Sequence, residues 1–136
     1  MAAETTAVAR GSQRFGRKAS SAALVASPFT LTYGTTDNQT NDVMEAGYVP
    51  AGVTVIGFLV VMSDMETATT NVRHKITLGS TDLVTAIALG GAGGADFFPC
   101  TPTTTTAATL VKVTTTTAAG TGAAGTAYVT PLYYSA

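Results

Sequence analysis

The chain has 136 residues, enough for one domain, and only 11% of them are charged, where an average soluble protein has about 25%. Thr and Ala contribute 27 and 23 residues, and the net charge is −1. This composition excludes a coiled coil and the highly charged kind of disordered chain. A single Cys excludes an internal disulfide, and with a single His it argues against a zinc site, so we expect no metal and no cofactor.

Residues 1–27 are predicted to form an extended basic arm. They hold four of the seven basic residues of the chain against one acid, Glu4, whereas the rest of the chain is mildly acidic. The segment is rich in small and hydroxyl residues, so alone it buries too little apolar area to offset its ordering entropy. We therefore expect it to be either mobile or ordered by a partner. The residues expected to contact that partner are Arg10, Arg14, Phe15, Arg17 and Lys18.

Residues 28–136 are predicted to form one β domain. Phe29, Leu31 and Tyr33 alternate with Thr, which is the period-two pattern of a half-buried strand. A second short strand is predicted over residues 43–49. It is followed by a tight turn at residues 50–52, where Pro and Gly suit type II geometry.

Residues 53–62 predict the strongest strand, because apolar side chains lie in both directions along it. Alternation points Val53, Val55, Leu59 and Val61 one way and Ile56, Phe58, Val60 and Met62 the other. Such a strand is covered on both sides, by a second layer or by a neighbouring subunit, and Gly57 suggests a bulge. The expected subunit interface comprises Ile56, Phe58, Val60, Tyr133 and Tyr134.

The later elements are less regular. Residues 72–78 predict an amphipathic strand with a basic outer face, in which His74 belongs to the apolar set and is expected to be a partly buried or edge histidine. Ser80 or Thr81 can cap a helix of about two turns that ends at Gly90 and Gly91, with a strand as the alternative.

Two prolines in residues 96–102 block pairing in a central strand. Residues 110–117 and 126–134 predict a hairpin across a glycine-rich turn. The expected fold is therefore all-β, a β-sandwich or jelly roll with one short helical insertion and an extended N-terminal arm.

The sequence offers no catalytic constellation, and we expect no enzyme. His74 and Cys100 are the only His and Cys, and the neighbours of Cys100 would not lower its pKa. The acidic residues lie mostly in predicted turns. Nucleic-acid binding would depend on the arm alone, and the acidic balance of the body disfavours it. The longest apolar run has ten residues, where a membrane-spanning helix needs about 20, so no membrane is expected.

One stretch carries a family resemblance. The sequence NDVMEAGYVPAGVTVI at residues 41–56 resembles the D-V-[IM]-E-x-G-x-[LV]-P-A-G stretch of small virion proteins of tailed bacteriophages. The aromatic strand at 29–33, the Gly-Ser-Thr-Asp turn at 79–82 and the Gly/Ala/Thr-rich end at 125–134 also match this pattern. The resemblance covers residues 28–134 and leaves the arm outside.

This resemblance implies a structural virion protein, a cement or decoration protein that stabilises contacts between major capsid subunits. It implies a jelly-roll or sandwich body, a dimer or trimer, and a place on the outer capsid surface with the major capsid protein as partner. A neck, tail or head-spike component is the alternative within the virion. A host-attachment or glycan-binding module is the alternative from another class, with Tyr48, Tyr128, Tyr133 and Tyr134 as its stacking groups.

Overall fold

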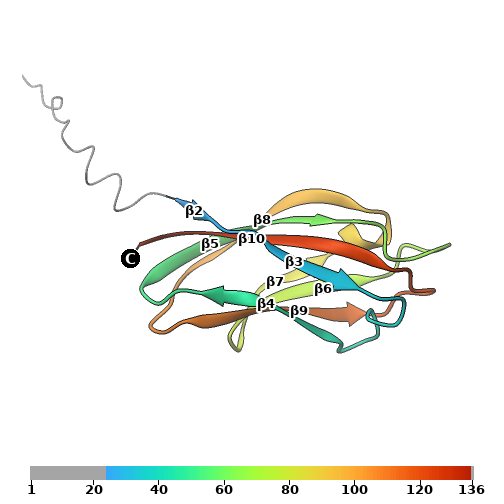
Figure 1. Ribbon diagram of the computed structural model, residues 1–136, viewed down its shortest axis with the longest axis horizontal. Helices are drawn as coiled ribbons and strands as arrows, with labels where there is room; N and C mark the ends of the chain where they lie inside the picture. Colours follow the sequence, from blue (N-terminus) through green and yellow to red (C-terminus); the bar gives the residue numbers. More distant parts are fainter. Residues whose placement is uncertain (1–23, 136) are drawn as a thin grey trace, which may run out of the picture.

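The computed structural model describes residues 24–135, which fold into two antiparallel β-sheets packed face to face (Figure 1). The first, called here the β5 sheet, has the order β2-β10-β5-β8, with β3 also pairing with β10. Its strands are β2 (Val25–Ala26), β3 (Phe29–Tyr33), β5 (Val53–Met62), β8 (Gly94–Thr104) and β10 (Gly125–Ser135). The second, the β9 sheet, comprises β4 (Val43–Val49), β9 (Thr109–Thr117), β6 (Arg73–Leu78) and β7 (Thr81–Ile87), in that order. The predicted all-β sandwich is confirmed.

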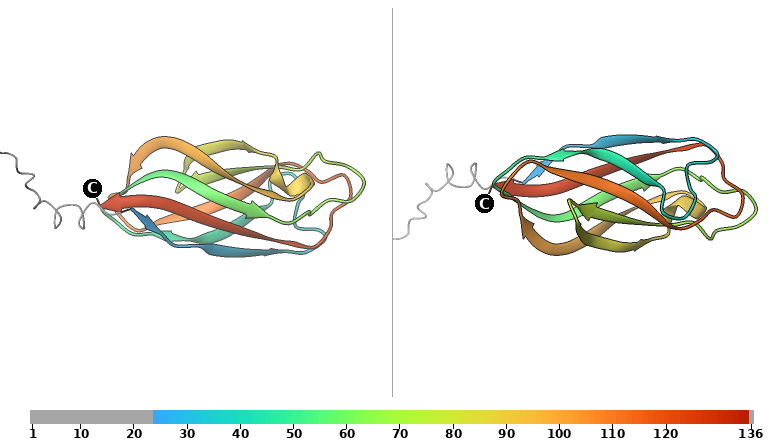
Figure 2. Two further views of the ribbon diagram at one scale, coloured as in Figure 1. Left: turned by 90° about the horizontal axis from the view of Figure 1, so that it is seen from above. Right: turned by 90° about the horizontal axis from the view of Figure 1, so that it is seen from below.

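The chain changes sheet at almost every connection, as the two views in Figure 2 show. The predicted hairpin of residues 110–117 with 126–134 is therefore wrong: β9 lies in one sheet and β10 in the other. Both edges of β9 are occupied by β4 and β6, and both edges of β10 by β5 and by β2 with β3. The glycine-rich segment between them spans the two layers.

The predicted helix over residues 81–89 is also wrong, and its stated alternative, a strand, is what forms. β7 pairs with β6 as a tight hairpin in which Leu78 lies opposite Thr81. Gly79 adopts a φ of 63°, a conformation that such turns require and glycine supplies without strain. The β-branched residues of β7 favour this pairing. Within the described residues the only helix is a 3₁₀ turn, η1 (Leu89–Gly91).

Other sequence predictions are confirmed. Gly52 has a φ of 74°, as the glycine of a type II turn requires. The proline-containing strand β8 lies at the edge of its sheet, and no described strand pairs with its outer side. One expected boundary differs from the structure: Val25 and Ala26, assigned to the arm from the sequence, pair with β10 as β2. No helix in residues 24–135 is long and apolar enough to cross a membrane.

The core lies between the sheets, and its centre is β5. The pairing of β5 with β8 shifts register between Val55 and Gly57, and this bulge changes which side chains point inward. Before the bulge Val53 and Val55 are buried, and after it Phe58, Val60 and Met62 are buried. Phe58 and Val60 are completely buried, so their predicted place in a subunit interface is wrong. The outward side chains of β5 are Leu59 and Val61.

Candidate interaction surface

The outer face of the β5 sheet carries a cluster of exposed apolar side chains. Leu59 is 42% exposed and Val61 39%, and their neighbours Phe97 and Tyr128 are exposed to a similar degree. Leu59 lies directly opposite Phe97 on β8, and Val61 lies directly opposite Tyr128 on β10. Cross-strand neighbours of this kind are about 5 Å apart and touch. The four residues therefore form one continuous surface across three strands, called here the apolar face.

Phe97 lies flat against the sheet because Gly57 leaves room for its ring. A β-carbon at Gly57 would come within 2.5 Å of the Phe97 ring and 2.9 Å of the Phe98 carbonyl oxygen. The β5 bulge lies directly before Gly57, where Ile56 has no partner in either neighbouring strand. The register shift turns Leu59 and Val61 outward, and Gly57 leaves the space that flattens the apolar face beside them.

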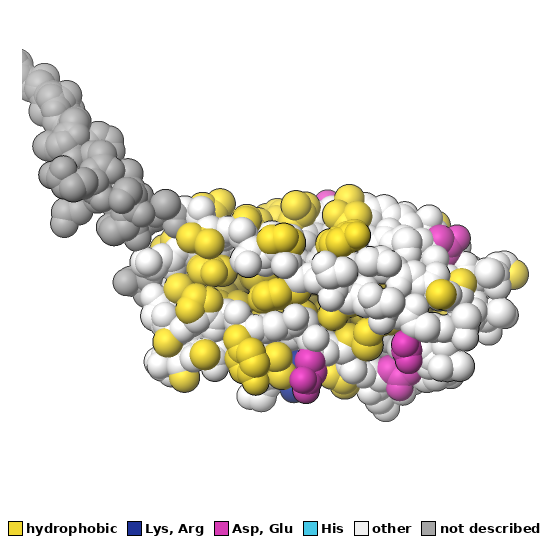
Figure 3. Space-filling view, in the orientation of Figure 1, with side chains coloured by type: hydrophobic (Ala, Val, Ile, Leu, Met, Phe, Trp, Pro, Cys, Tyr) yellow, Lys and Arg dark blue, Asp and Glu magenta, His cyan; other side chains and the backbone are white. Residues whose placement is uncertain are grey.

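The apolar face contains no charged side chain. Among the described residues of the five strands in this sheet, Asp96 is the only charged one. It lies opposite Val60, whose side chain points into the core, so Asp96 belongs to the other side of β8. Figure 3 shows the β3 and β4 side of the molecule, where hydrophobic side chains gather toward the chain ends and acidic ones lie mainly at the rims.

The outer face of the β9 sheet has the opposite character. The three basic residues of the described chain, Arg73, Lys75 and Lys112, all lie on its strands. Lys75 forms an ion pair with Asp82 at 3.3 Å, and Lys112 lies opposite Glu45 in the strand register. The two broad faces of the sandwich therefore differ in charge, one ionic and one uncharged.

A buried polar cluster joins the loops at the end remote from the described chain ends. Glu66 is 2% exposed and accepts hydrogen bonds from the Thr69 hydroxyl and from the backbone amides of Val72 and Gly120. Burial raises the pKa of Glu66, but these hydrogen bonds outweigh it and lower the pKa to about 2. The ionised carboxylate thereby ties the segment before β6 to the segment before β10.

His74 belongs to the same end and is completely buried. Its Nε2 lies 2.7 Å from the Asn38 side-chain oxygen, which also accepts a hydrogen bond from the Thr115 hydroxyl. Because an amide oxygen only accepts, Nε2 carries the proton, and Nδ1 has no partner among the described residues. Burial lowers the pKa of His74 to about 4. The predicted place of His74 in the apolar set of its strand is confirmed, but the residue is completely buried on an interior strand, where partial burial or an edge position was expected.

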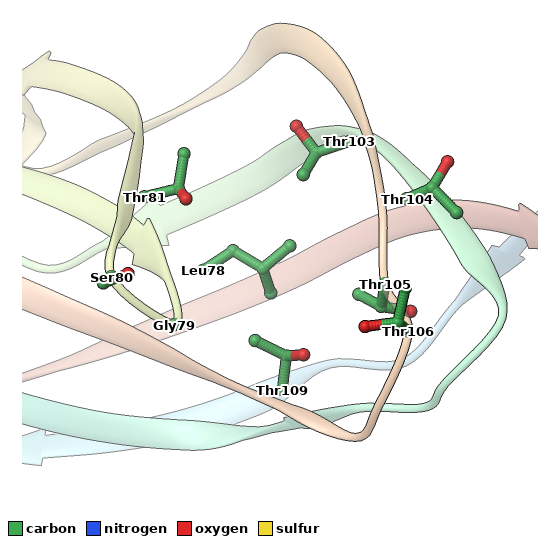
Figure 4. A pocket seen from close by; sticks show the side chains of 9 residues that line it. All are labelled: Leu78, Gly79, Ser80, Thr81, Thr103, Thr104, Thr105, Thr106 and Thr109. Carbon is green, nitrogen blue, oxygen red and sulfur yellow. The ribbon is translucent and has the colours of Figure 1, made fainter.

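A shallow hollow of about 240 Å³ lies between the β6–β7 turn and the β8–β9 connection (Figure 4). Apart from Leu78 and Gly79, its lining consists of Ser and Thr. Several of these hydroxyls already donate to backbone carbonyl oxygens: Thr103 to Thr101, Thr105 to Pro50 and Thr109 to Ala107. The hollow therefore offers few free polar groups to a ligand.

The remaining predicted site residues are dispersed. The arm residues, Arg10, Arg14, Phe15, Arg17 and Lys18, lie outside the described residues. Ile56, Tyr133 and Tyr134 are half-buried, and Tyr133 packs against the core. Tyr48 and Tyr128 are exposed on different sheets, so the four tyrosines do not form one stacking platform.

Cys100 is half-buried, and burial raises the pKa of its thiol. No cluster of three His, Cys, Asp or Glu side chains within residues 24–135 has the arrangement that a metal ion needs.

The sequence interpretation missed Leu59, Val61, Phe97 and Tyr128 as a surface. One readable signal was the near-absence of charge from residues 53–62, 94–104 and 125–135, which hold a single acid between them. That these three segments are neighbours in one sheet could not be read from the sequence.

Comparison with solved structures places the fold. A chain of the capsid asymmetric unit of cyanophage Pam1 is similar over 85% of this chain and 87% of its own, with 23% identity and a TM-score of 0.71. A chain of the capsid of Ralstonia phage GP4 is similar over 84% and 85%, with 19% identity and the same TM-score. A family 35 carbohydrate-binding module from Clostridium thermocellum has a TM-score of 0.49, too low to support an argument. No protein-family model and no curated protein matches the sequence.

Proposed function

We propose that this protein, which shares its fold with chains of two phage capsids, is a structural component of a phage particle, of the cement or decoration type. In this role it binds the outer surface of the capsid and stabilises contacts between major capsid subunits. The body is the domain of residues 28–136, joined by Val25 and Ala26 of β2. The rest of the basic arm of residues 1–27 is a strap across neighbouring capsid subunits, and the protein acts as a homo-oligomer.

The observation that carries this proposal is the extent of the structural similarity. The aligned part makes up nearly the same share of this chain and of each capsid chain, so the three chains have similar lengths. A small one-domain chain within a capsid is what a cement or decoration protein would be. Identities of 23% and 19% make this an argument from fold, which the surface must support independently.

The surface supports a role in assembly. The described residues include no cluster suited to metal binding, and the buried His74 and half-buried Cys100 do not form a nucleophile with its base. By contrast, one broad side of the sandwich is uncharged and carries the apolar face, and an exposed apolar cluster of this kind typically marks a protein–protein contact. A face of this kind serves packing between subunits.

The test is the copy number and position of the protein in purified particles, measured by quantitative mass spectrometry and cryo-electron microscopy. We expect hundreds of copies distributed over the shell. A dozen copies or fewer at one vertex would contradict the cement role and assign the protein to the neck, tail or spike. Absence from every particle would refute the proposal, and a glycan-binding screen would then test the attachment alternative.

A further inference from the structure

The apolar face is unusual for the solvent side of an antiparallel sheet. Such a sheet normally packs one side on the core and carries polar side chains on the other. In β5 the outward residues after the bulge are Leu59 and Val61, two positions apart on a central strand. Phe97 and Tyr128 extend the apolar area to the strands on either side. No described segment of the chain covers this surface.

The absence of charge on this face favours a partner surface that is also uncharged. A partner rich in acidic or basic groups would find nothing here with which to pair its charges, and each buried unpaired charge would cost several kcal/mol. The same argument disfavours the basic arm of this chain as the cover. A second apolar face of the same composition meets no such penalty, since the face has no charge to desolvate.

The dimensions also suit a copy of the same face. The ten residues of β5, at about 3.3 Å each, and four strands about 4.8 Å apart give the whole outer side of the β5 sheet, which is the apolar face with the uncharged side chains around it, an area of roughly 600 Å². Stable interfaces bury about 600 to 1,000 Å² on each partner. Packed sheets generally stack face to face at about 10 Å. Phe97 lies close over Gly57, which permits such stacking on this face.

From these observations we infer that the apolar face binds the same face of a second copy of this chain, giving a two-fold symmetric dimer with β5 near its axis. The inference rests on the proposed structural role, because it names one partner of the same surface. In a two-fold interface both copies contribute the same surface, so a single substitution changes the interface at two symmetric places. Leu59, at the centre of the face, is the most sensitive position.

The experiment measures the mass of the full-length protein by light scattering after size-exclusion chromatography. At about 100 µM, well above a micromolar Kd, we expect the wild type to have twice the chain mass of 13.7 kDa. Leu59→Lys places like charges in the interface, and we expect it to be a monomer. Tyr48→Lys is the matched control: Tyr48 is 65% exposed on the β9 sheet, and this variant should remain a dimer.

A charge-reversal rescue keeps the test independent of folding. Leu59→Glu alone should also be a monomer, and mixing it with Leu59→Lys should restore the dimer, because opposite charges then meet across the interface. Tyr128→Ser and Tyr48→Ser form a milder matched pair, of which only Tyr128→Ser should weaken the dimer, by about tenfold or more. Thermal unfolding of each variant verifies that it is folded.

The outcomes separate this inference from the proposed function. A monomeric wild type, or equal effects of the changes at Leu59 and Tyr48, would overturn the second-copy interface. If the wild type is a monomer and Leu59→Lys prevents binding to particles, the face belongs to the capsid, and only this inference fails. If the dimer forms as described but the protein is absent from particles, the proposed function fails and the dimer interface stands.

Discussion

Glu66 shows how one residue holds together a part of the fold made of loops. Its carboxylate is buried, yet its pKa falls to about 2 because amide and hydroxyl donors surround it. Those donors come from two connections, residues 63–72 and 118–124, that join different pairs of strands. A buried charge is stable only when it is paired or fully hydrogen-bonded, and here backbone groups satisfy it.

Replacing Glu66 by Gln tests this role. The amide group keeps one acceptor oxygen and directs its NH₂ at groups that are themselves donors, so we expect the free energy of unfolding to fall by about 2–4 kcal/mol. Urea denaturation measures it. Asp82→Asn, which breaks the exposed ion pair with Lys75, should cost about 0.5 kcal/mol or less. Equal effects of the two changes would contradict the assigned role of Glu66.

His74 predicts how stability depends on pH. Its pKa is about 4 in the folded protein and 6.5 in an unfolded chain, so between these values the unfolded chain binds a proton that the folded protein does not. Stability is therefore full above pH 6.5 and falls as the pH decreases to 4, by about 3 kcal/mol. Glu66 extends the loss below pH 4.5, because its folded pKa of about 2 lies under the ordinary value.

The measurement is the free energy of unfolding at a series of pH values for the wild type and for His74→Gln. The variant lacks the titrating ring, so its stability should be nearly independent of pH between 6.5 and 4.5, although lower throughout. A wild-type slope that persists in the variant would show that another group titrates there.

Among the elements, β5 combines the core and the proposed interface. Its bulge at Gly57 reverses the alternation, so that Phe58 and Val60 enter the core and Leu59 and Val61 face outward. One strand thus contributes apolar side chains to two surfaces. The absence of a side chain at Gly57 makes this arrangement sterically feasible, because the Phe97 ring lies where a β-carbon would be.

Gly57→Ala tests the element. The added methyl group would meet the Phe97 ring and, at 2.9 Å, the Phe98 carbonyl oxygen, which belongs to the rigid strand ladder. We expect a loss of about 1–3 kcal/mol in the free energy of unfolding, as overpacking usually gives. Thr101→Ala, an exposed change on the same edge strand, should stay within about 0.5 kcal/mol. A neutral Gly57→Ala would contradict this close packing.

At the scale of the whole molecule, the sandwich has two broad faces of different character. All basic residues of the described chain lie on the β9 sheet, where acids accompany them, and the β5 sheet presents an uncharged surface. In the proposed particle the apolar face of the β5 sheet joins copies of the protein, and the basic arm binds them to the shell.

Neutralising the arm tests the proposed strap. In the full-length chain, we change Arg10, Arg14, Arg17 and Lys18 to Ala. Binding to particles that lack this protein should weaken by about tenfold or more, and the binding should depend less on salt concentration. The dimer and its unfolding temperature should not change. The control changes Arg73, Lys75 and Lys112 on the β9 sheet to Ala and should bind as the wild type does. Equal binding by the wild type and the arm variant, measured by co-sedimentation, would refute the strap.

Local sequence patterns correctly predicted the all-β class, the aromatic strand at 29–33, the strong strand at 53–62, the turn at Gly52 and the edge position of the proline-containing strand. Each depends on local physics: alternation with period two, the φ of a turn glycine, or the missing amide hydrogen of proline. The same alternation assigned His74 to the apolar set of its strand, but its complete burial was not predicted.

The other features of the fold depend on strand pairing, which is non-local and cannot be read from local patterns. Residues 110–117 and 126–134 follow each other but join different sheets, and residues 81–87 form a strand because β6 offers an edge. The register shift at Gly57 set which residues of β5 face outward, overturning the interface assigned to Phe58 and Val60. The apolar face and the Glu66 cluster are built from segments far apart in the chain, whose proximity arises only when the two sheets pack.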